Sequence, residues 1–395
     1  MAGVLIVDIL LIAILVAAVV GGITRGLIAS IGTLVGLIAG GAAAFWLAPL
    51  VSGLIPSAQW RGVAVIALSV GLLVIGAGLG STLGLLVRRG VDWAAPLRVI
   101  DRILGGVASL VIAALAVSLV GTAIATTGIP VVSSAVASSR VLRAIDDLIP
   151  APVASGLAQL RGAVLSEGLP SLGILFKSQT APTSPPVDLN DPTLARAANS
   201  VARISGVAYA CGESLTGSGF VVTADEVVTN AHVVAGVDHP VVDLPGRGSL
   251  DGSIVYFDPE HDLAVIRVNG MDARALPLTT TLGAGSSAAF AGYPYGGPFS
   301  IGDARVLSVG VVNVPDIYDR ATAPRDVYEL AASVRPGNSG GPLLTASGAV
   351  AGVVFARGKN DPDLGYAMTS TMLSPVVAKA ASLTAPVSSG SCAAG

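Results

Sequence analysis

The chain has 395 residues, of which 52% are hydrophobic and only 12% are charged, and its mean hydropathy is +0.77. It is far more apolar than a soluble protein of this length, so part of it must lie in a membrane. The net charge of −3, without any basic run, excludes the electrostatic surface that nucleic-acid binding requires.

Charged residues divide the chain in two. The first 139 residues carry only nine charged side chains, whereas the remainder has the composition of a soluble protein. In the charge-poor half, four stretches are long enough to cross a hydrocarbon core of about 30 Å as helices. We place these spans near residues 4–23, 27–48, 63–87 and 104–128, which makes residues 1–128 an all-α membrane domain. Trp46, Trp60 and Trp93 lie at predicted span ends, as interfacial aromatic residues do.

Arginine residues orient these spans. The connections after the first and third spans carry Arg25, Arg88, Arg89, Arg98 and Arg102, whereas the connection after the second carries Arg61 alone. The positive-inside tendency places the arginine-rich connections in the cytoplasm. We therefore expect a multi-pass protein of the plasma membrane, in contact with the lipid bilayer, with everything after about residue 128 on the extracytoplasmic or periplasmic side. The first span has no basic segment before it, so it is expected to stay as an anchor rather than be cleaved.

Small and acidic residues mark two features within the spans. Glycine recurs at every fourth position in the second and third spans, at Gly32, Gly36, Gly40, Gly76, Gly80 and Gly84. Such spacing predicts faces where helix backbones pack closely, rather than a pore. Asp8 is a functional candidate because it lies within a span, but solvation at the interface is the favoured interpretation. The layout, with VDILLIAILVAAVVGGITRG and DRILGGVASLV, resembles the colicin V production family of membrane proteins.

Residues 129–195 are predicted to connect the membrane domain to the rest of the chain. Apolar residues repeat with helical spacing from Val141 to Ile149 and again from Val153 to Val164, which predicts amphipathic helices. The following SQTAPTSPPVDLNDPT is rich in Ser, Thr and Pro and is typical of an extended, protease-accessible linker.

Residues 196–395 are predicted to form an all-β domain, because about ten short β-rich runs alternate with turn residues. Three residues stand out within it. His232 follows a strand in VVTNAHVVAG, Asp262 leads the strand DLAVIRV, and Ser339 lies in RPGNSGGPLL. An imidazole can act as a general base, a buried acid can orient it, and a serine can attack a carbonyl. Their order, His then Asp then Ser, on a β scaffold is that of chymotrypsin-type proteases.

The motifs TNAHVVAG, HDLAVIRV, GYPYGGP and RPGNSGGPLL resemble trypsin-like serine proteases of the bacterial heat-shock type. The whole layout resembles the membrane-bound, periplasmic acid-resistance proteases of mycobacteria and related actinobacteria. This resemblance implies a chymotrypsin-like double β-barrel that cleaves envelope proteins and peptides without a metal or other cofactor. It implies that His232 is the base, Asp262 its orienting acid and Ser339 the nucleophile, with the N–H groups of Gly337 and Ser339 forming the oxyanion hole.

The resemblance also implies a position for the pocket that binds the residue before the cleaved bond. Ser333, six residues before the nucleophile, would form its floor, and Val354, Phe355 and Ala356 its wall. A serine floor without an acid favours medium or bulky apolar residues there. Self-cleavage within residues 165–200 is expected because the linker is tethered near the active site. Only 56 residues follow Ser339, so we expect no C-terminal peptide-binding domain.

Cys211 and Cys392 are the two cysteines, and both lie in the part predicted to be outside the cytoplasm. An oxidising compartment favours a disulfide between them over two free thiols. Two other functional classes remain open for the chain as a whole. One is a membrane stress sensor or scaffold whose protease-like domain mainly binds partners, and the other is a four-span transporter.

Overall fold

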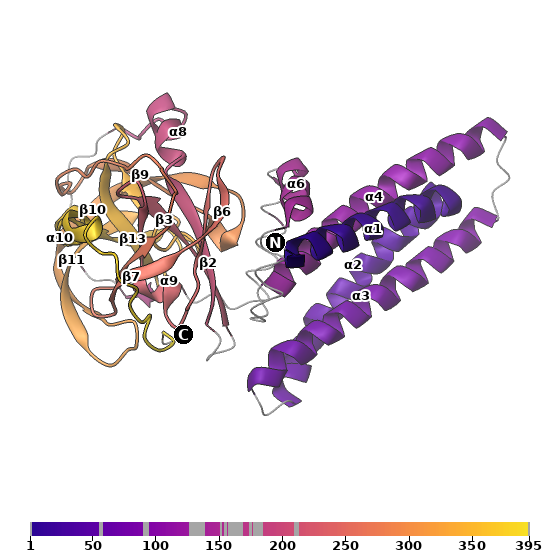
Figure 1. Cartoon of the computed structure of the whole chain (residues 1–395), viewed down its shortest axis with the longest axis horizontal. Helices are drawn as coiled ribbons and strands as arrows, with labels where there is room; N and C mark the ends of the chain where they lie inside the picture. Colours follow the sequence, from indigo (N-terminus) through magenta and orange to yellow (C-terminus); the bar gives the residue numbers. More distant parts are fainter. Residues whose placement is uncertain are drawn as a thin grey trace. The chain divides into compact units, whose positions relative to one another are not determined.

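The computed structural model describes residues 2–54, 58–89, 95–125, 139–150, 152–153, 156, 169–173, 176, 185–208 and 213–393. The chain folds as two units, Met1–Pro150 and Ala151–Gly395. The described part of the first unit is helical, and that of the second consists mainly of β-strands (Figure 1). The predicted fold class, an all-α membrane domain followed by an all-β domain, is confirmed.

Four long helices form most of the first unit. Each contains a segment long and apolar enough to cross a membrane: Ile6–Arg25, Leu27–Ala44, Ala67–Val87 and Val99–Ser118. The helices are α1 (Ala2–Arg25), α2 (Leu27–Leu54), α3 (Ala58–Arg89) and α4 (Ala95–Ala125). Within this unit α2 packs along α3, and α1 packs along α4 (Figure 1). Trp46 is exposed just beyond the second span, as predicted, whereas Trp93 and the side chain of Trp60 lie outside the described part.

The glycines of α2 and α3 form the predicted packing face. A Cβ atom on Gly36 would lie 2.0 Å from the carbonyl oxygen of Gly76, and one on Gly80 would lie 2.0 Å from that of Gly32. A second close contact, which the sequence analysis did not single out, joins α1 to α4. There a Cβ atom on Gly22 would lie 2.3 Å from the carbonyl oxygen of Gly105.

Gly80→Leu is therefore expected to destabilise the helical unit by about 1–3 kcal/mol, because the added side chain must push α3 away from α2. The matched control is Gly78→Leu on the same helix, since no atom lies within 4 Å of a Cβ atom built there. The measurement is the thermal midpoint of each full-length variant in detergent. Equal midpoints for the two leucine variants would contradict this packing face.

The fourth helix begins earlier than predicted. The fourth span was placed near residues 104–128, whereas α4 begins at Ala95 and so includes the charged residues Arg98, Asp101 and Arg102. Asp101 is only 5% exposed, and its Oδ1 accepts a hydrogen bond of 2.9 Å from the N–H of Leu27. A carboxylate placed at a helix N-terminus satisfies a donor that has no partner within the helix, which explains how α4 accommodates this charge.

Asp8 likewise has structural partners. Its Oδ1 accepts hydrogen bonds from Ser139 Oγ at 2.6 Å and from the N–H of Val141 at 3.3 Å. Ser139 Oγ in turn accepts from the N–H of Leu142, as an N-cap does, so both residues hold the start of helix α6 (Arg140–Leu148). The first predicted amphipathic segment of the connector thus forms a helix within the first unit. The second, from Val153 to Val164, lies mostly outside the described residues.

The first sheet of the second unit closes on itself. Its seven strands lie in the order β6-β5-β2-β3-β4-β8-β7. The end strands β6 and β7 are separated by Gly252 alone and so are two halves of one bent strand, which closes the first barrel. The strands are β2 (Val201–Ala208), β3 (Glu213–Val221), β4 (Glu226–Thr229), β5 (Val241–Leu244), β6 (Gly248–Asp251), β7 (Ser253–Asp258) and β8 (Leu263–Arg267).

The second sheet, in the order β1-β13-β12-β9-β10-β11-β14, also closes, because β13 pairs with β14 as well as with β12. Its strands are β1 (Ser171–Leu172), β9 (Ser287–Gly292), β10 (Ser300–Pro315), β11 (Thr322–Ala331), β12 (Pro342–Leu344), β13 (Val350–Gly358) and β14 (Leu364–Thr369). Helix α10 (Ser370–Ala380) follows β14. Strand β1 lies within the segment assigned to the connector, and helix α8 (Pro192–Ala198) spans the predicted boundary near residue 195.

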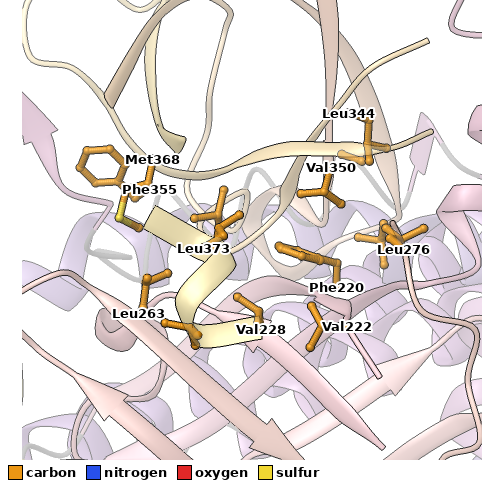
Figure 2. Packing of buried hydrophobic residues seen from close by; sticks show 14 of the residues in the cluster. Phe220, Val222, Val228, Leu263, Leu276, Leu344, Val350, Phe355, Met368 and Leu373 are labelled. Atoms are coloured by element: carbon orange, nitrogen blue, oxygen red, sulfur yellow. The ribbon is translucent and has the colours of Figure 1, made fainter. Parts of the chain in front are cut away.

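A shared apolar core joins the two barrels. Side chains of the first barrel meet side chains of the second in one buried cluster (Figure 2). Phe220, Val228 and Leu263 come from the first barrel, and Val350 and Phe355 come from the second. This core fixes the relative position of the barrels, and the candidate site draws its residues from both.

Candidate functional site

Sheet pairing brings two of the predicted site residues together. His232 lies in the single-turn helix α9 (Ala231–Val234) directly after β4, and Asp262 immediately precedes β8. Strands β4 and β8 pair with Thr229 opposite Ala264. The end of one strand therefore lies beside the start of the other, which places the imidazole against the carboxylate.

The His232–Asp262 pair is buried and tightly bonded. His232 is 7% exposed and Asp262 2% exposed. His232 Nδ1 lies 3.0 Å and 2.9 Å from the two carboxylate oxygens of Asp262, and the backbone N–H of His232 donates to Oδ1 at 3.0 Å. Because an ionised carboxylate only accepts hydrogen bonds, Nδ1 carries a proton, and the neutral ring then has its lone pair on Nε2.

Asp262 adopts a left-handed backbone conformation, with φ of 56°. This region is uncommon for residues other than glycine, and surrounding hydrogen bonds must hold it. The Asn230 side chain donates to the Asp262 carbonyl at 2.9 Å. Arg325, on β11 of the second barrel, donates to the carbonyl of Glu260 from Nε at 3.1 Å and from Nη2 at 2.6 Å. Both residues thus position the loop that carries the acid.

Arg325 is unusual because it is a 1% exposed arginine. Burial lowers the pKa of its guanidinium, while the carboxylates of Asp262, Asp258, Asp316 and Glu260 oppose that shift. The group also bonds the carbonyl of Pro315 at 2.8 Å and lies over the ring of Phe355, 5.8 Å from its centroid. It therefore ties the acid-bearing loop of the first barrel to the second barrel. Sequence reasoning missed it, since an arginine within a strand normally faces solvent.

Ser339 lies in the turn that precedes β12, and Ser218 of β3 positions that turn. The N–H of Ser218 donates to the Ser339 carbonyl at 2.7 Å, and its hydroxyl donates to the Gly337 carbonyl at 2.6 Å. The N–H of Tyr293 donates to the same hydroxyl at 2.9 Å. Ser218 was also missed, although a serine between two glycines in a buried strand, GSG, was a usable signal.

The peptide group before Gly337 has a defined direction. The carbonyl of Pro336 accepts from the N–H of Tyr295 at 2.6 Å. Since no described peptide bond is cis, the N–H of Gly337 in that same peptide group points away from Tyr295. Within the described part of the chain, the backbone N–H groups of Gly337 and Ser339 donate to no other group. Both are therefore available to an acceptor.

His232 Nε2 and Ser339 Oγ are both shielded from solvent and, among the described residues, neither has a hydrogen-bond partner. Buried polar atoms are nearly always paired, and an exception calls for an explanation such as a catalytic role. Nε2 therefore keeps a lone pair that can accept a proton, and Oγ keeps a hydroxyl proton that it can give up.

A second histidine–aspartate pair stabilises the turn that leads to Asp262. Asp258 Oδ1 accepts from the N–H groups of Glu260 and His261, and Oδ2 lies 2.9 Å from His261 Nδ1 and 3.1 Å from the Tyr256 hydroxyl. Burial raises the pKa of Asp258, but hydrogen bonds from His261 and Tyr256 outweigh it and hold that pKa below its ordinary value. His261 thus bonds Asp258, whereas His232 bonds Asp262.

We expect Asp258→Asn to lower the free energy of unfolding by about 1–2 kcal/mol at pH 7, because the neutral amide accepts these hydrogen bonds less strongly. A carboxyl whose folded pKa is depressed contributes stability above its unfolded pKa, about 3.9, and loses it as pH falls through the lower folded value. The difference between the two proteins should therefore persist at pH 5 and shrink below about pH 4. Urea unfolding at pH 7, 5 and 3 measures it, and a difference independent of pH would contradict this role.

The proposed pocket residues lie in two settings. Val354, Phe355 and Ala356 of β13 are buried, whereas Ser333 is exposed. The preference for apolar residues assumed that no acid accompanies Ser333. However, Ser333 Oγ donates to Asp363 Oδ1 at 2.6 Å, so a carboxylate lies beside the proposed floor.

Comparisons with known proteins match both units. A family model described as colicin V production protein matches residues 7–150, and one described as trypsin-like peptidase domain matches residues 217–353. The chain is 32% identical over 312 residues to the serine protease Rv3671c of Mycobacterium tuberculosis, which covers 77% of this chain and 78% of that protein. The crystal structure of that protease in its active form is similar with a TM-score of 0.51 and 34% identity, covering 56% of this chain and 100% of that one. Protease Do-like 1 of Arabidopsis thaliana is 33% identical over 143 residues, 35% of this chain and 32% of that protein.

Proposed function

This chain belongs to the family of membrane-anchored, trypsin-like serine endopeptidases that includes Rv3671c, and on that basis we propose that His232, Asp262 and Ser339 form its catalytic triad. The proposal rests on the hydrogen bonding and burial of these three side chains. Asp262 bonds His232 Nδ1, which leaves Nε2 as the acceptor, while Nε2 and Ser339 Oγ are buried without partners among the described residues.

The proposed reaction follows from these atoms. Ser339 Oγ attacks the scissile carbonyl carbon as its proton passes to His232 Nε2, and Asp262 stabilises the resulting imidazolium. The N–H groups of Gly337 and Ser339 donate to the oxygen that becomes negative. The imidazolium then protonates the leaving amine as the C–N bond breaks, which leaves an acyl ester on Ser339. Water attacks the ester carbonyl carbon as His232 takes its proton, and the ester C–O bond then breaks as the imidazolium returns that proton to Ser339 Oγ, which releases the carboxylic acid product.

We place this chemistry outside the cytoplasm, in support of envelope and acid resistance. Arginine residues concentrated in the first and third connections favour that orientation, and the acid-resistance role is the one that the sequence resemblance implies. Envelope proteins are then the substrates. The test compares envelope protein N-termini in cells that produce wild type or Ser339→Ala: substrate-derived termini should appear only with wild type. If Ser339→Ala restores acid survival to a deletion strain, the sensor or scaffold alternative replaces proteolysis.

Self-cleavage within residues 165–200 remains part of the proposal because this segment leads directly into the protease domain. Sequencing the N-terminus of purified full-length protein detects it. Wild type should yield new termini in this range, and Ser339→Ala should not. New termini in both proteins would indicate another protease.

We also propose that Cys211 and Cys392 form a disulfide that fastens the C-terminal tail. Two facts support this. Cys392 carries no free thiol, although Cys211 lies outside the described residues. The tail before Cys392 is bonded to the first barrel, with the N–H of Val387 donating to Ile254 at 2.8 Å and that of Gly236 donating to Ser389 at 3.1 Å.

Cys392→Ser is expected to destabilise the protease domain by up to about 5 kcal/mol, because the bridge would close a loop of roughly 180 residues. Denaturant unfolding of both proteins under oxidising conditions measures this, with thiol titration of the unfolded wild type as the control. Two titratable thiols per chain would contradict the bridge. Unchanged peptide hydrolysis by a folded Cys392→Ser variant would show that the bridge stabilises the domain without controlling its activity.

A further inference from the structure

One edge of β13 lies beside the nucleophile and is only partly covered by β12. On one side β13 pairs with β14 from Gly352 to Arg357. On the other side β12 reaches only from Val350 to Val353. The N–H of Gly340, next to Ser339, donates to the carbonyl of Val354 at 2.8 Å, so the edge beyond Val354 continues directly from the nucleophile turn.

The chain's own segment Leu169–Gly173 occupies this edge. Strand β1 runs parallel to β13, with Ser171 opposite Arg357. The N–H of Arg357 donates to Pro170 at 3.0 Å, and the N–H of Lys359 donates to Leu172 at 2.8 Å. The hydroxyl of Tyr366, on β14, donates to the Gly173 carbonyl at 2.7 Å.

Two leucines anchor the same segment. Leu169 packs against the buried cluster inside the second barrel, and Leu172 packs against the cluster shared by the barrels. The pairing itself is short, since β1 has two residues and Pro170 has no N–H to donate. A strand held by a few hydrogen bonds and two side chains can be displaced by a longer partner.

We propose that Leu169–Gly173 is a built-in competitor of the substrate, which must leave the edge of β13 before an extended peptide can pair there. An extended peptide binds a protein by adding a strand to a free sheet edge, and such an edge accepts one strand at a time. The edge beyond Val354 lies beside Ser339. The backbone N–H groups that this edge could offer to a peptide, those of Arg357 and Lys359, already donate to Pro170 and Leu172. Residues 169–173 also precede the protease barrels in the connector, so release of this segment couples substrate access to the state of the connector. This inference rests on the proposed catalytic role of Ser339.

The test weakens the Leu172 anchor. Leu172→Asp should displace β1, because a carboxylate is unfavourable against the apolar cluster, and should lower KM for an extended peptide substrate about tenfold with kcat nearly unchanged. Leu172→Ala adds no charge and should lower KM about threefold. It tests the same inference if Leu172→Asp does not fold. The matched control is Val187→Asp, since Val187 is another partly buried residue before the barrels that packs on the same cluster. It should leave KM unchanged.

Two further measurements separate this inference from the proposed function. A serine-reactive fluorophosphonate, too small to need the β13 edge, should label Ser339 equally in wild type and the Leu172 variants. A capped synthetic peptide of residues 169–173 should inhibit the variants in trans. Failure of every protein to label would refute the proposed function. Equal labelling with an unchanged KM in folded Leu172 variants would overturn the inference and leave the triad intact.

Discussion

Ser339→Ala is expected to reduce kcat/KM for peptide hydrolysis by at least about 10⁴-fold, because the nucleophile and its proton are removed together. The substitution should not destabilise the protein. Ser339 Oγ is buried without a hydrogen-bond partner among the described residues, so its loss breaks no hydrogen bond there. The variant should therefore lose activity without losing stability, as expected for a polar side chain whose role is catalytic rather than structural.

The matched control is Ser347→Ala, an exposed serine of the same domain, which should retain full activity. His232→Ala should lose activity to a similar extent, and the double variant should be little slower than either single one, because the two side chains act as a unit. Steady-state hydrolysis of one peptide by all four variants provides the measurement. Additive losses in the double variant would show that the two residues do not share a catalytic step.

Local patterns predicted the strands and the triad candidates. Short apolar runs between turn residues defined the β-domain, and each candidate lay in a distinctive motif next to a strand. The pairing of β4 with β8 then brings His232 and Asp262 together. The fold class could be predicted because the pattern of short apolar runs between turn residues recurs along the β-domain.

Contacts between distant segments were not predictable in the same way. Ser218 holds Gly337 across 119 residues, and Arg325 holds Glu260 across 65. A buried arginine or a serine within a strand leaves no periodic or compositional pattern in the sequence, because its hydrogen bonds form only after the two barrels pack together. The same holds for β1, whose partner strand begins at Val350 and whose own sequence is indistinguishable from a linker.

Charges near the membrane spans were misjudged for a related reason. Asp101 fell outside the predicted fourth span, and Asp8 was interpreted as a solvated group. Each instead bonds the N-terminus of another helix, α2 in one case and α6 in the other. A carboxylate within an apolar helix can thus be stabilised by a neighbouring helix end, which a single-helix criterion cannot detect.

Gly337→Ala is expected to lower kcat by about 10²–10³-fold, the usual effect of losing one oxyanion-hole donor. Gly337 has φ of 89°, and a Cβ atom there would lie 2.3 Å from the Tyr293 carbonyl oxygen and 2.7 Å from the Tyr295 nitrogen. Both contacts are with backbone, so the turn itself must shift. Any shift that breaks the Tyr295–Pro336 hydrogen bond also turns the Gly337 N–H away from its present direction.

Gly348→Ala separates this effect from backbone strain. Gly348 has φ of 75°, but a Cβ atom there would be 3.4 Å from its nearest neighbour, an ordinary contact. It should cost about 1 kcal/mol of stability with kcat unchanged, whereas Gly337→Ala should lose kcat well beyond its loss of stability. The measurements are kcat with saturating peptide and the free energy of unfolding for both variants. If Gly337→Ala kept its kcat, the Gly337 N–H would not stabilise the oxyanion, and Ser339 would depend on a donor elsewhere in the turn.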